Sequence, residues 1–97
     1  MVDEFEQWFS THQQYFQHNR IGVDFTRRAL PSPAAFATFE SKSFVASITV
    51  WETGACDIHV LSYQTGEPVF AERHDLNSSD ELETILEDAY TRITRND

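Results

Sequence analysis

The sequence has few of the residues that cross-link a chain or bend it freely: its 97 residues include one cysteine, three glycines and three prolines. A single cysteine excludes an internal disulfide, and three glycines leave no glycine-rich phosphate loop. Basic residues are also scarce, with 7 Lys and Arg against 16 Asp and Glu and a net charge of −9. This charge argues against partners such as nucleic acid or an anionic membrane, because both attract basic patches.

Long apolar runs are missing too. No stretch approaches the roughly 20 apolar residues of a membrane span, and no basic segment followed by an apolar run marks a signal peptide. What the chain does have is aromatic residues, with eight Phe, three Tyr and two Trp to fill a core. We therefore expect a single domain over residues 1–97, located in the cytoplasm.

The stretch from residue 47 to 70 predicts two antiparallel hairpins that share their middle strand. Apolar and polar side chains alternate along it, as they do in half-buried strands. Gly54 and Gly66, each preceded by threonine, can take the left-handed conformation that closes a hairpin turn. Placing Ile48 opposite Ile58 puts the apolar residues on one face, whereas a shift by one residue would scatter them.

Helices are predicted at both ends of the chain, over residues 3–18 and about 78–93, from apolar residues at helical spacing. The aromatic stripe of the first helix predicts a core face, with an exposed interaction helix as the alternative. Phe36 and Phe39 share a predicted strand, and which of them faces the core is left open. The predicted strands cover residues 21–26, 34–40, 44–51, 55–61 and 68–75.

Short links between these elements favour an antiparallel meander. Both helices have apolar stripes to bury, and one sheet face is strongly apolar. The predicted fold class is therefore α+β: a two-layer sandwich in which a five-stranded antiparallel sheet carries the N- and C-terminal helices on one face. The other sheet face should stay open.

The last strand fits this arrangement least well. Its register puts Phe70 on the buried face beside Val60, but Glu72 and His74 then point to the same side. A bulge near Ala71, or an early exit from the sheet, would relieve this conflict.

Two carboxylate–histidine pairs on neighbouring strands are of metal-ligand type: Asp57 with His59, and Glu72 with His74. In the predicted register the two pairs point to opposite faces, and only a slip of the last strand would unite them. Asp57 instead lies opposite Arg73, where a cross-strand ion pair can form. Because these two pairs point apart, we expect no metal site. No serine lies beside a base that could activate it, so we also expect no cofactor and no enzyme activity.

The open sheet face is the candidate binding surface. Trp51 ends its strand there, among apolar and charged residues, and such mixtures anchored by an aromatic are typical of protein interfaces. The alternative is that a loop or the chain termini cover this face. An acidic face on the second helix is expected to lie nearby, unless it is simply solvated. The candidate partner-binding residues are Trp51, Thr49, Glu52, Asp57, His59, Leu61, Arg73, Glu83 and Glu87.

The layout resembles the TriTu-type bacterial immunity proteins. The shared features are a Phe- and Trp-rich first helix, a stretch like ITVWETGACDIHVL, a TGE turn, a VFAERHDL-like strand and a final acidic helix. The resemblance is densest over residues 48–76 and leaves out residues 26–43. It consists of core and turn residues, not of a catalytic motif.

The resemblance implies a cytoplasmic antitoxin that binds a cognate protein toxin, an ADP-ribosyltransferase delivered between bacteria and acting on elongation factor Tu. It assigns no contact residues. Two other classes compete with it: a small acidic secretion chaperone that binds an unfolded stretch of an effector, and a small metal-dependent or hydrolytic enzyme. A monomer and a weak dimer are both compatible with the sequence.

Overall fold

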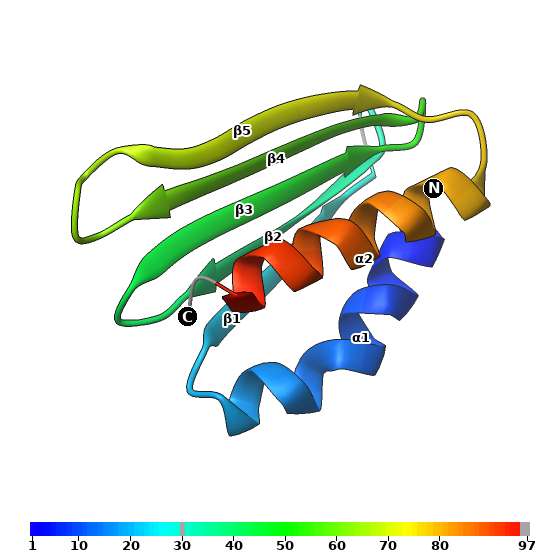
Figure 1. Ribbon diagram of the computed structural model, residues 1–97. Coiled ribbons are helices and arrows are strands. Elements are labelled where there is room, and N and C mark those ends of the chain that lie inside the picture. Colours follow the sequence, from blue (N-terminus) through cyan, green and yellow to red (C-terminus); the bar gives the residue numbers. More distant parts are fainter. Residues whose placement is uncertain (30, 96–97) are drawn as a thin grey trace.

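The computed structural model describes residues 1–29 and 31–95, with side chains in the last helix up to residue 93. Along the chain, one helix precedes the five strands and a second helix follows them (Figure 1). The helix, five-strand, helix order predicted from the sequence is confirmed. The elements are α1 (Val2–His18), β1 (Gly22–Arg28), β2 (Ala34–Glu40), β3 (Phe44–Trp51), β4 (Ala55–Ser62), β5 (Pro68–Asp75) and α2 (Ser79–Arg95).

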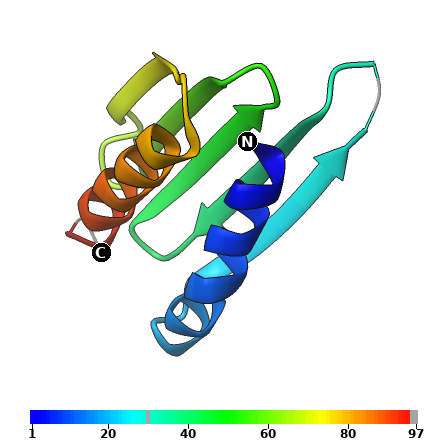
Figure 2. The ribbon, with the colours of Figure 1, turned by 90° about the vertical axis from the view of Figure 1, so that its right-hand side faces the viewer.

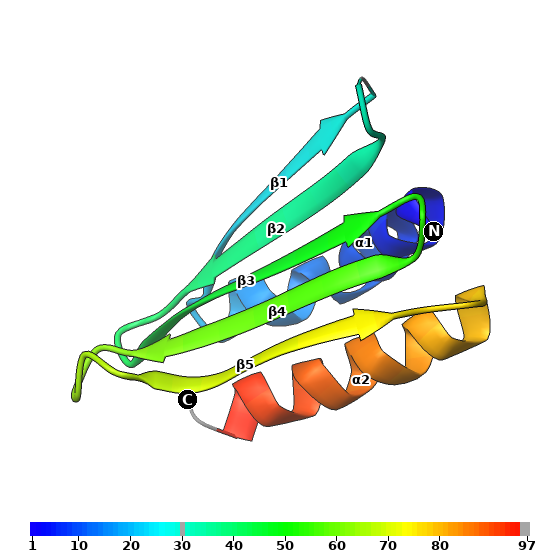
Figure 3. The ribbon, with the colours of Figure 1, turned by 90° about the horizontal axis from the view of Figure 1, so that it is seen from above.

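The strands form one antiparallel sheet in the order β1-β2-β3-β4-β5, which is the predicted meander. Both helices lie on the same face of this sheet (Figure 1). Figure 2 shows them side by side, with α1 over the β1–β3 half and α2 over the β4–β5 half. Seen from above, the opposite sheet face carries no helix (Figure 3). The molecule is therefore a two-layer α+β sandwich.

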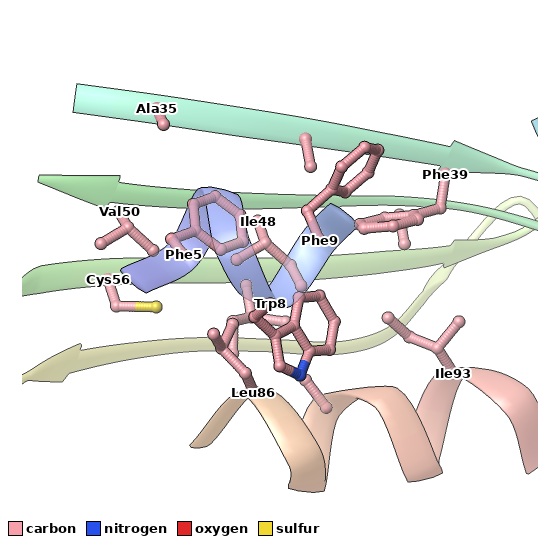
Figure 4. Packing of buried hydrophobic residues seen from close by; sticks show 14 of the residues in the cluster. Phe5, Trp8, Phe9, Ala35, Phe39, Ile48, Val50, Cys56, Leu86 and Ile93 are labelled. Carbon is pink, nitrogen blue, oxygen red and sulfur yellow. The ribbon is translucent and has the colours of Figure 1, made fainter. Parts of the chain in front are cut away.

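The register of the central hairpin is the one that the apolar alternation predicts. Ile48 pairs with Ile58, and both are at most 1% exposed beneath the helices. Gly54 and Gly66 have positive φ angles of 103° and 71°, as expected for the two turn glycines. The helices close the core from the other side with large side chains (Figure 4). Those buried on α1 are Val2, Phe5, Trp8, Phe9 and Phe16, and those on α2 are Leu82, Leu86, Ala89 and Ile93.

Strand β2 settles which of its two phenylalanines is buried. Phe39 is fully buried under the helices, whereas Phe36 is 43% exposed on the opposite face. Thr38 and Glu40 lie on the Phe36 side, since side chains alternate along a strand. Of the two phenylalanines of β2, Phe39 thus belongs to the core and Phe36 to the open sheet face.

Strand β5 departs from one expectation. The register shift lies between Val60 and Leu61, so the bulge falls at Val69 and not near Ala71. Glu72 therefore stays on the helix side, opposite Ile58. The structure accommodates it there by means of α2, and not by the predicted bulge.

The residue that accommodates Glu72 is Arg92 of α2. Its Nη1 donates to Glu72 Oε2 at 2.6 Å, and its guanidinium lies 3.7 Å from the centre of the Phe70 ring. The hydrogen bond from Arg92 lowers the pKa of the Glu72 carboxyl, and a second one from His74 adds to it. A charge at the sheet edge is thus paired across the two layers.

Candidate functional site: an open sheet face and an interhelical groove

The open sheet face presents aromatic and polar side chains from all five strands. Its central row, read from the strand pairing, runs from β1 to β5 and has Thr49 in the middle. Neither helix covers this face (Figures 1 and 3). The row consists of Thr26, Phe36, Thr49, Asp57 and Arg73.

Trp51 ends β3 on this face and is half-buried. The Arg73 guanidinium lies 5.7 Å from the centre of the indole ring, within the range of a cation–π contact. Arg73 Nη1 also lies 3.4 Å from Asp57 Oδ1, which confirms the predicted cross-strand pair. The indole is thus partly shielded by one cation and remains accessible beside an exposed Phe36.

The remaining open-face candidates point where the sequence predicts. Thr49 and Leu61 are half-buried and His59 is exposed, in alternation with buried neighbours. Asp57 and His59 therefore face away from Glu72 and His74, as the register predicts. No group of three or more possible metal ligands comes together in the described part of the chain. The expectation of a metal-free protein stays a prediction.

Glu52 has a different role from its neighbour Trp51. Its carboxylate accepts hydrogen bonds from the Met1 ammonium at 2.9 Å and from the Val2 amide at 3.2 Å. These contacts lower the pKa of Glu52, the ammonium contributing most. They also satisfy a donor at the start of α1, where helical N–H groups lack partners. Glu52 thus ties the β3–β4 turn to α1.

Glu83 and Glu87 lie on α2, on the other side of the sheet from Trp51 (Figure 1). The sequence placed this acidic surface near the open face, and the structure separates the two by the thickness of the sheet. The physical reason is that α2 buries its apolar stripe on the opposite sheet face. The nine candidates therefore do not form one site.

The two glutamates instead line a groove of about 410 Å³ between α1 and α2. Glu87 Oε1 accepts a hydrogen bond from Trp8 Nε1 at 3.1 Å and lies 3.4 Å from His12 Nε2. Figure 4 shows the indole nitrogen of Trp8 turned toward α2. The residues that line the groove are Glu4, Gln7, Trp8, Thr11 and His12 of α1, and Ser79, Asp80, Leu82, Glu83, Leu86 and Glu87 of α2.

Sequence reasoning missed Phe36 as an open-face residue. A signal was present, because Thr38 and Glu40 share its parity in the strand and an acidic residue favours the solvent side. The groove had no such signal. Trp8 and Glu87 are 79 positions apart, and only the docking of the two helices brings them together.

Neither helix is long and apolar enough, over the described residues, to cross a membrane. The chain is thus a small α+β protein with an open sheet face and a groove between its two helices. A family model described as "Immunity protein TriTu" matches residues 3–92, so the chain belongs to the TriTu immunity protein family. The match includes residues 26–43, where the resemblance seen in the sequence was lacking. No curated protein matches the chain.

Proposed function

We propose that this protein is an antitoxin that binds a cognate secreted bacterial toxin and neutralises it without catalysis. The observation that carries the proposal is the family match over nearly the whole chain. The toxin is proposed to be an ADP-ribosyltransferase that acts on elongation factor Tu, and the cytoplasm, where that target resides, is the proposed place of action. Binding needs no cofactor, metal or nucleic acid.

We infer that the open sheet face contacts the toxin. Its support is that an exposed Phe36 and a half-buried Trp51 lie on the same sheet face, which no helix covers. Interface energy concentrates in large aromatics that a partner can seal from water. Phe36 of β2 lies opposite Thr49 of β3, and Trp51 is the last residue of β3. One partner surface can therefore cover Phe36 and Trp51 together. Arg73 and Asp57 would set the orientation and rate of association more than the affinity.

Replacing Trp51 by alanine is expected to weaken toxin binding by well over tenfold while leaving the fold intact, because truncating such an aromatic often costs about 2 kcal/mol, which is about thirtyfold in affinity. Isothermal titration calorimetry against the cognate toxin measures the loss, and circular dichroism checks folding. Tyr15→Ala is a matched control, since Tyr15 is an aromatic that is 38% exposed on α1. Unchanged affinity in folded Trp51→Ala would exclude this face.

A further inference from the structure

The groove between α1 and α2 combines an apolar base with an acidic rim. Its base is formed by Trp8, Leu82 and Leu86, which are 8%, 1% and 1% exposed. At about 410 Å³ it has room for one or two large side chains. The groove is therefore large enough to admit a side chain from outside the molecule.

Four carboxylates line this groove, from Glu4, Asp80, Glu83 and Glu87, and among the residues that the structure describes neither lysine nor arginine lines it. Glu4 is partly neutralised, because the Met1 ammonium lies 3.1 Å away. Glu87 accepts the Trp8 indole hydrogen bond. Within the described ranges, the carboxylates of Asp80 and Glu83 form no ion pair or hydrogen bond. Like charges around one groove repel each other, and a cationic occupant would relieve that repulsion.

We propose that this groove binds an arginine-bearing basic segment of the toxin. The proposal rests on the antitoxin function proposed above and adds a second contact surface, on the side of the molecule opposite Trp51. It commits to arginine because a planar guanidinium can pair with a carboxylate in bidentate fashion and is more weakly hydrated than an ammonium, which suits it to an apolar base. The groove offers both features: unpaired Asp80 and Glu83 on the rim, and an apolar base that includes Trp8, whose indole is covered by the His12 ring at 4.6 Å between ring centres.

The two tryptophans of the chain make the proposal directly testable. Trp8 lies in the groove and Trp51 on the open face, so two indole N–H signals in a ¹⁵N-edited NMR spectrum report the two surfaces separately. The probe is a hexa-arginine peptide titrated into the labelled protein at low ionic strength. We expect a saturable shift of the Trp8 signal and no comparable shift of the Trp51 signal.

The decisive variant is Asp80→Asn/Glu83→Gln, which removes the two unpaired rim charges and keeps the side-chain shapes. It should raise the peptide Kd about fivefold or more, the effect of two weak surface ion pairs. Glu67→Gln/Asp88→Asn is the matched control, because it removes the same net charge at exposed positions that line neither the groove nor the open sheet face. Equal losses in the two variants, or no saturable Trp8 shift in the wild type, would overturn the proposal.

The same spectra with the toxin separate this proposal from the antitoxin function. Toxin binding that shifts the Trp8 signal, and that weakens in Asp80→Asn/Glu83→Gln more than in the control, supports the groove as a contact. Binding that leaves Trp8 unshifted overturns the groove and leaves the antitoxin function standing. No binding of the toxin to the wild type overturns the antitoxin function and the toxin as occupant, while the peptide titration still decides whether the groove accepts arginine.

Discussion

Gly54→Ala is expected to lower the free energy of unfolding by about 3 kcal/mol or more. Gly54 has φ +103°, which strains any L-residue by about 1–2 kcal/mol. A Cβ there would also lie 2.2 Å from the Leu76 carbonyl oxygen, a backbone atom that cannot rotate away. Moving Leu76 would stretch its 2.8 Å N–H hydrogen bond to the Gly54 oxygen, worth about 1 kcal/mol.

Gly66→Ala is the matched control for this prediction. Gly66 also has a positive φ, +71°, but an added Cβ would meet nothing within 4 Å. Its loss should be confined to backbone strain, about 1–2 kcal/mol. Urea denaturation of both variants measures the difference. If Gly54→Ala lost no more stability than Gly66→Ala, the close contact between the β3–β4 turn and the β5–α2 link would not contribute to the free energy of unfolding.

The second large effect is expected at Ile58, which is 1% exposed at the middle of β4. Ile58→Ala should cost about 2–5 kcal/mol, since it leaves a cavity between the sheet and the helices. His59→Ala, one position along on the open face, should change stability by about 0.5 kcal/mol or less. Chemical denaturation gives both values, and the reverse order would contradict the facing of β4.

Much of this fold can be predicted from the sequence, because the local patterns of apolar residues and turn glycines agree with the overall arrangement of the sheet. The alternation around Ile48 and Ile58 fixes the register, and the glycines at 54 and 66 mark its turns. The same reasoning fails at β5, where Glu72 on the apolar side looks like a conflict. Glu72 is paired by Arg92, which lies 20 positions away on α2, and no local sequence pattern predicts this pair.

The candidate site was predictable only in part, for a similar reason. Alternation along one strand assigns Trp51 to the open face, and the structure agrees. The relation between that face and α2 depends on which side the helix packs, so Glu83 and Glu87 were grouped with the wrong surface. Glu52 was also grouped by chain proximity, although its carboxylate binds the start of α1.

The two surfaces proposed to contact the toxin differ in character. The open face supplies aromatic area, and the interhelical groove supplies negative charge with an apolar base. The first is expected to dominate the affinity and the second its salt dependence. With overall dimensions of 35 × 26 × 24 Å, the molecule is small enough for one partner to reach both sides.

The most direct test of neutralisation by binding is to titrate the purified protein into a fixed amount of its cognate toxin while measuring ADP-ribosylation of elongation factor Tu. If the proposed antitoxin acts by binding, toxin activity should fall linearly, reach its end at one equivalent of this protein and not change with further incubation. Residual activity at large excess would contradict this mechanism. So would complete, time-dependent loss of activity at a small fraction of one equivalent, because that result would require turnover and hence an enzyme.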